Sequence, residues 1–162
     1  MRHTGAVAAG IAGGMLVLSG CSAVELPLAG VRAAPDGTPY AVLRPCGGDD
    51  YGNPSLDGWP RGANDGPVTT GWDVRKEGLR GAADFPLFVP PAGWAARHRG
   101  PQRLLPRHHY VLRFGQYTGD DSRTGTVEFT AEQAGRLRPG QVWADGRVMS
   151  GPEFERLAAD SC

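Results

Sequence analysis

The segment YVLRFGQYTGDDSRTGTVEFT, residues 110–130, decides the fold because it carries two strand patterns joined by a turn. Residues 124–130 supply the returning strand, and Gly119-Asp120-Asp121 supplies the turn between the two. The segment therefore predicts a long antiparallel hairpin. Alternate residues of its first strand share one face: Tyr110, Leu112, Phe114 and Gln116.

Shorter strand signals lie on both sides of this hairpin. Apolar or alternating runs at 40–44, 68–75 and 85–89 each end at or near a turn residue and predict strands. Asp145-Gly146, inside residues 142–149, is a strong signal for a two-residue hairpin turn and predicts a second hairpin.

Two helix starts are marked near the C-terminus. Thr130 with Gln133, and Ser150 with Glu153, both have the spacing of a capping box, which satisfies free N–H groups at the start of a helix. We therefore expect a mainly β fold, an antiparallel β-sandwich of immunoglobulin-like character with two short C-terminal helices. The cysteine and tryptophan spacing of true immunoglobulin domains is absent.

Two stretches rich in turn residues remain. Residues 46–67 are dense in Gly, Asp, Asn and Pro, and they predict a long loop that is either functional or packed by its own aromatics. Residues 90–107 are basic and interrupted by prolines, which predicts a second irregular, solvated segment.

The N-terminus has the pattern of a secretory leader. Arg2 and His3 precede an uncharged run from Ala6 to Leu18, and the small residues Ser19 and Gly20 come just before a cysteine. The run is shorter than the roughly 20 apolar residues that a membrane-spanning helix needs. We therefore expect the leader to be removed rather than to form a span.

Leu18-Ser19-Gly20-Cys21 resembles the lipobox of bacterial lipoproteins. In that family the cysteine sulfur receives a diacylglyceryl group, and cleavage makes that cysteine the first residue of the mature chain. The resemblance implies a signal peptide over 1–20, lipidation at Cys21 and attachment to the outer face of the cell membrane. The alternative is an ordinary secretory signal in which Cys21 has no role.

We expect a lipidated, poorly ordered tether over 21–38 and a single extracytoplasmic domain over 39–162. Two segments carry a further resemblance: the one from Phe129-Thr130 through residues 138–143, and the C-terminal residues 154–162. Their sequences resemble those of uncharacterised secreted lipoproteins of high-GC Gram-positive bacteria. This resemblance implies no activity.

The resemblance to lipoproteins also implies how the remaining cysteines pair. If Cys21 carries lipid, Cys46 and Cys162 remain as a pair in an oxidising compartment, where disulfides persist. A bridge between them would tie the end of the chain to the start of the domain. The alternative is two unpaired thiols.

The sequence offers little support for metal binding or catalysis. His98, His108 and His109 lack the spacing of a structural zinc site, and the aspartates lack the ordered spacing of a calcium loop, so we expect no metal and no cofactor. No G-x-S-x-G or S-x-x-K motif occurs, and we predict that the chain is not an enzyme. A net charge of zero argues against a nucleic-acid partner. The aspartates considered are Asp49, Asp50, Asp57, Asp65, Asp120 and Asp121.

Aromatic residues are the better candidates for binding. Trp59, Trp94 and Tyr51 lie outside the predicted strands and could anchor a partner, although packing beneath a loop is the alternative for both tryptophans. Trp72 and Trp143 fall on strand faces and are expected in the core.

These observations favour a membrane-anchored, non-enzymatic binding module whose partner is an envelope protein or glycan. Two alternatives stay open: a lipoprotein that binds a small ligand or metal ion, and a hydrolase of a cell-envelope polymer.

Overall fold

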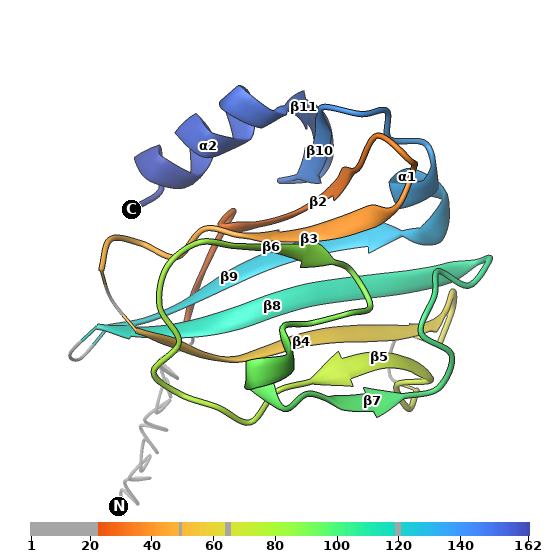
Figure 1. The fold of residues 1–162 in the computed structure, drawn as a ribbon, viewed down its shortest axis with the longest axis horizontal. Coiled ribbons are helices and arrows are strands. Elements are labelled where there is room, and N and C mark those ends of the chain that lie inside the picture. The colour runs from red at the N-terminus through yellow and green to blue at the C-terminus, as the bar shows by residue number, and fades with distance from the viewer. Residues whose placement is uncertain (1–22, 49, 64–65, 119–120) are drawn as a thin grey trace, which may run out of the picture.

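Two β-sheets make up most of the molecule, as the computed structural model shows for residues 23–48, 50–63, 66–118 and 121–162 (Figure 1). The six-stranded sheet has the order β1-β9-β8-β4-β5-β7, and the five-stranded sheet has the order β11-β10-β2-β3-β6. All neighbours pair antiparallel except β1 and β9, which are parallel. The strands are β1 Val24–Leu26, β2 Ala29–Ala33, β3 Pro39–Leu43, β4 Tyr51–Pro60, β5 Thr70–Asp73, β6 Ala83–Pro86, β7 Arg97–Arg99, β8 His108–Thr118, β9 Asp121–Thr130, β10 Gln141–Ala144 and β11 Arg147–Ser150.

The predicted hairpin over residues 110–130 is confirmed as β8 and β9, which pair from His109 and Thr130 to Thr118 and Asp121. The alternation within β8 is confirmed as well, because all four residues assigned to one face are at most 1% exposed. This face meets the five-stranded sheet across the main core. Members of that core include Val31 and Phe85 from one sheet and Trp72 and Leu112 from the other.

The two predicted helices are confirmed as α1, Ala131–Gly135, and α2, Gly151–Asp160, and both capping boxes form. The Asp145-Gly146 hairpin is also confirmed: both residues have positive φ, 50° and 70°, as its tight turn requires. A single 3₁₀ turn, η1, covers Ala92–Trp94. The mainly β prediction with two short helices near the C-terminus is therefore correct.

Helix α2 covers the outer face of the five-stranded sheet, on the side away from the six-stranded sheet (Figure 1). Phe154 of α2 is 1% exposed and packs with Val142 and Met149 in a second apolar cluster. Gly30 in β2 lets the helix come close, because a Cβ there would lie 2.8 Å from Val142 and 3.4 Å from the Phe154 ring. The part of the five-stranded sheet that lies beneath α2 is consequently buried on both faces.

The predicted tether over 21–38 is wrong for most of its length. β1 adds to the edge of one sheet, and β2 is an inner strand of the other, with Leu28, Ala29 and Val31 fully buried. A strand buried on both faces shows no polar alternation, and the small apolar residues of β2 therefore look like a linker in the sequence. The folded domain begins before residue 39.

The predicted loop over 46–67 is also wrong, because β4 occupies its middle as a central strand ten residues long. A bulge between Gly52 and Ser55 accommodates Asn53, which has a φ of 51°, and the proline that follows it. Gly58 lies under Tyr110, where a Cβ would come within 2.5 Å of the ring. The Asn, Pro and Gly residues of β4 therefore form a bulge and leave room for a neighbouring ring, and they do not form a turn.

Among the residues that the structure describes, no helix combines the length and apolar character needed to cross a bilayer. Cys21 and the expected signal peptide over 1–20 lie outside the described residues.

Candidate functional site

The outer face of the six-stranded sheet, here called the open face, carries the polar and aromatic residues of its strands. On β4, Leu56 points into the core, so the alternation places Asp57 and Trp59 on the open face. β8 contributes His109 and Arg113 to the same face. Two neighbouring hollows are lined by these side chains, and the described residues that line them all come from strands or loops.

The first hollow, here called the Trp59 hollow, lies over β1, β9, β8 and β4. The rings of Trp59 and His109 lie 5.5 Å apart, and Nε2 of His109 is 3.6 Å from a carboxylate oxygen of Glu128. Glu25 lies at the β1 side of this hollow, so that side carries negative charge. Its lining includes Glu25, Trp59, His109, Val111, Arg113 and Glu128.

The indole N–H of Trp59 is buried and has no hydrogen-bond partner among the described residues. The other two tryptophans on strands each donate a hydrogen bond from the indole N–H. Trp72 donates to the Leu87 carbonyl over 2.8 Å, and Trp143 donates to the Glu128 carbonyl over 2.8 Å. Trp72 is fully buried, as expected, whereas Trp143 is half-buried and packs at the edge of the core.

The second hollow, here called the arginine hollow, lies over β4, β5, β7 and β8. Asp57 is 5% exposed and accepts a hydrogen bond from the Ser55 hydroxyl at 3.1 Å. It also accepts Nη1 of Arg99 at 3.2 Å and Nη2 of Arg113 at 2.8 Å. A buried carboxylate of this kind needs such partners, since removal from water disfavours its charge.

Asp73 organises the other half of the arginine hollow. Nη2 of Arg99 donates to it over 2.8 Å, and Nε of Arg97 donates over 3.1 Å. Arg75 is held loosely, with its Nε 3.9 Å from the Asp73 carboxylate and its side chain 78% exposed. Arg99 thus bridges both carboxylates, which joins four strands into one ion-pair network.

Partial burial alone would raise the pKa of the Asp73 carboxyl. Hydrogen bonds and positive charge from Arg97 and Arg99 outweigh this effect and hold the pKa of Asp73 below its usual range. The carboxylate therefore stays ionised at neutral pH and keeps the arginines in place. Four guanidinium groups surround two carboxylates, so the arginine hollow has an excess of positive charge.

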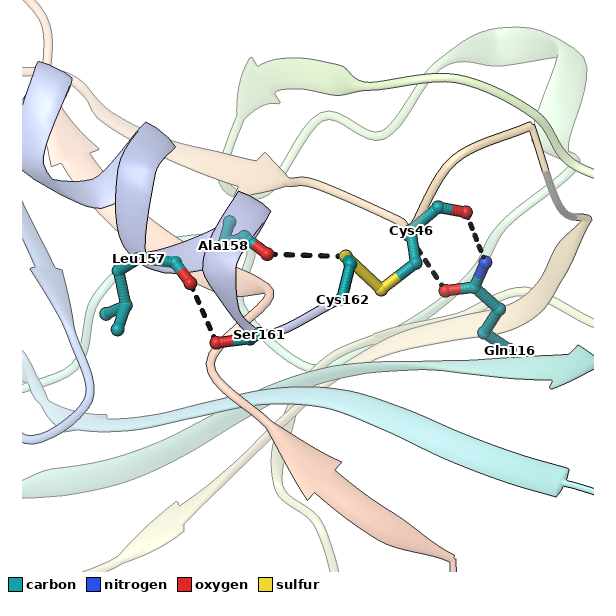
Figure 2. The surroundings of a disulfide bond; sticks show 6 residues. All are labelled: Cys46, Gln116, Leu157, Ala158, Ser161 and Cys162. Atoms are coloured by element: carbon teal, nitrogen blue, oxygen red, sulfur yellow. Dashed lines mark hydrogen bonds between the residues drawn. A yellow bond between two sulfur atoms is a disulfide. The ribbon is translucent and has the colours of Figure 1, made fainter.

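The expected disulfide is present between Cys46 and Cys162, with Cα atoms 5.4 Å apart (Figure 2). The buried Gln116 side chain holds the Cys46 backbone from both sides, accepting from its N–H at 3.0 Å and donating to its carbonyl at 2.8 Å. This explains why a polar residue sits on the inward face of β8. The disulfide ties the end of the chain, just after α2, to the segment between β3 and β4.

The three residues expected to bind a partner have different surroundings. Trp59 lines a hollow on the open face. Tyr51 is 2% exposed, and burial raises the pKa of its hydroxyl, so the expectation that it contacts a partner is wrong. Trp94 is half-buried and packs edge-on against Tyr51 and Phe85, at 6.4 and 5.2 Å between ring centres. Trp94 therefore packs against the surface of the hydrophobic core, as the alternative of packing beneath a loop predicts.

The three histidines do not converge. His98 contacts Gln102, His108 contacts the Pro106 carbonyl, and His109 lies beside Trp59. Within the described ranges, no three His, Cys, Asp or Glu side chains are grouped so that they could hold a metal ion. Asp49, Asp65 and Asp120 lie outside the described residues.

The sequence did not indicate the arginine hollow. Asp57 lies in the stretch 46–67, whose composition predicts a loop, and Arg97 and Arg99 lie in the basic stretch 90–107. A local signal existed in Asp57-Gly58-Trp59, where glycine separates two large polar or aromatic residues, as on an alternating strand. Comparisons with protein-family models, with curated proteins and with solved structures found no match.

Proposed function

We propose that this chain is a lipid-anchored, extracytoplasmic binding module of the cell envelope, and that the open face of the six-stranded sheet is its binding surface. The leader and Leu18-Ser19-Gly20-Cys21 support the anchor, because they have the order of a lipoprotein signal. The disulfide supports an oxidising compartment outside the cytoplasm.

The observation that carries the binding surface is the pair of adjacent hollows on the open face. Arg113 lines both of them, so the Trp59 hollow and the arginine hollow lie next to each other and share one side chain as a wall. Aromatic and arginine side chains are the types most enriched at recognition sites, because both supply large contact area and directional interactions. We assign a partner to this face and no catalytic step.

The position of β1 changes how the anchor would work. Val24 is only three residues after Cys21, and three extended residues span at most about 10 Å. With lipid on Cys21, the domain would be held close to the membrane surface rather than at the end of a long tether. Two acyl chains are enough for stable attachment.

The anchor is tested by Cys21→Ala in the full chain, with Ser22→Ala as the matched control. We expect incorporation of labelled palmitate into the parent and the control, and none into Cys21→Ala. The variant should leave the membrane fraction, and its melting temperature should not change, since residue 21 precedes the first strand. Palmitate labelling or membrane retention of Cys21→Ala would contradict the proposal.

The second candidate is a lipoprotein that binds a small ligand. The excess of positive charge in the arginine hollow favours it, because oriented guanidinium groups bind carboxylate or phosphate oxygens. Both candidates use the same face, and they differ in whether the ligand is free or part of an envelope polymer.

A further inference from the structure

We infer that the two hollows form one site for an anionic sugar unit, with its negative group in the arginine hollow and its ring against Trp59. The inference rests on the proposed use of the open face and names the chemistry of its ligand. The charged group is a phosphate or a carboxylate, because both present the paired oxygens that a guanidinium group recognises.

The arginines are already oriented for an anion. Asp57 fixes one edge of Arg99 and of Arg113, and each guanidinium has five N–H donors, so donors remain for a ligand. Arg75 is almost unused and lies in the same lining. An oxyanion that binds here would meet arginine side chains that the aspartates already hold in place. Binding therefore costs less conformational entropy than ordering free arginine side chains would.

The aromatic group lies at a suitable distance. Asp57 and Trp59 are alternate residues of β4, so they are separated by roughly 6.6 Å along the strand. This is comparable to the length of one sugar unit. A ring over Trp59 would therefore place its charged substituent beside Arg113, the side chain that lines both hollows.

The charge along the open face sets the orientation of the ligand. Glu25 and Glu128 line the far side of the Trp59 hollow, whereas the four arginines surround the other hollow. A negative group would be repelled at the first end and attracted at the second. The uncharged part of the ligand, including its sugar ring, would therefore bind in the Trp59 hollow.

The test is a calorimetric titration of the full chain, purified in detergent, at one fixed pH and ionic strength. The probes are glucose 1-phosphate, glucuronate, inorganic phosphate and glucose. We expect saturable binding of one or both anionic sugars, at least about tenfold tighter than binding of phosphate or glucose alone, because only the anionic sugars fill both hollows. The first two probes distinguish a phosphate ligand from a carboxylate ligand.

Three variants assign this binding to the site. Arg113→Gln, and separately Trp59→Ala, should each weaken it by at least about tenfold. Thr126→Trp should abolish it by filling the Trp59 hollow, and it leaves every arginine in place. Arg147→Gln removes the same charge from a side chain that pairs with Glu153 of α2 and lines neither hollow, and it should leave binding unchanged.

Absence of saturable binding by both anionic sugars would overturn the inference. Binding that none of the three site variants weakens, or phosphate binding as tight as that of glucose 1-phosphate, would also overturn it. None of these results bears on Cys21, so the lipid anchor stands or falls separately by palmitate labelling and fractionation.

Discussion

The two outer faces of this sandwich differ in what covers them. On the five-stranded sheet, small and apolar residues such as Gly30 and Val142 lie beneath Phe154 of α2. On the six-stranded sheet, the corresponding surface carries Trp59 and an ion-pair network centred on Asp57. The first face contributes to stability by burial, whereas the second is built from groups that can interact with a ligand.

Loss of the disulfide is the largest expected effect, and it acts on the covered side. Cys46→Ala with Cys162→Ala opens a loop that spans 116 residues, which on the chain-entropy model lowers the free energy of unfolding by about 4–5 kcal/mol. Denaturant titration of the double variant beside the oxidised parent measures this loss. Equal midpoints and slopes would show that the bridge does not hold α2 and its sheet together.

Truncation of Phe154 should come next. Phe154→Ala removes a fully buried ring from the α2 cluster and should cost about 3–5 kcal/mol. Trp59→Ala, the matched truncation on the open face, should cost clearly less because the Trp59 side chain is half-buried. Equal losses in the same denaturation experiment would remove the distinction between a structural face and a binding face.

Asp57→Asn should have an intermediate effect. Breaking a fully buried ion pair costs about 3–5 kcal/mol, but Arg99 and Arg113 are 36% and 53% exposed, so we expect about 1–2 kcal/mol after solvent screening. Asp84→Asn is the control and should cost less, because the Asp84 side chain, which pairs with Arg32 and Arg44, is 36% exposed whereas that of Asp57 is 7% exposed. A larger loss for Asp84→Asn would contradict the central role given to Asp57.

The smallest expected effect is on how the free energy of unfolding depends on pH in acid. Because Arg97 and Arg99 depress the pKa of Asp73 in the folded state, this carboxylate stabilises the fold above its usual pKa of about 3.9. That contribution is lost as the pH falls through the lower folded-state value. Unfolding free energies measured from about pH 5 downward should therefore fall less steeply in Asp73→Asn than in the parent. Identical slopes would show that Asp73 is not held by the arginines.

Local signals in the sequence were sufficient for part of this fold. The capping residues Thr130 and Ser150 act within one turn, and the alternation of β8 and β9 records a sheet with one buried face. Local patterns do not indicate β2 and β4, for opposite reasons. β2 is buried on both faces and has no alternation, whereas the glycines and prolines of β4 imitate a turn although they serve a bulge and a close ring contact.

The candidate site could be predicted only in part. Trp59 was singled out because large aromatics are common at binding surfaces, but Tyr51, chosen by the same rule, lies in the core. The arginine hollow needs Asp57, Asp73, Arg99 and Arg113, which come from four strands that only the sheet order brings together. Local sequence patterns do not encode that order.

The most direct test of the account is photo-cross-linking in intact cells. A photoreactive side chain placed at Val68, which lines the arginine hollow and leaves the Trp59 hollow open, should form adducts with envelope material, and one placed at the exposed Arg156 of α2 should not. Trp59→Ala in the same chain should reduce the adducts at position 68. Adducts at position 156 with none at position 68 would contradict the claim that the open face of the six-stranded sheet is the binding surface.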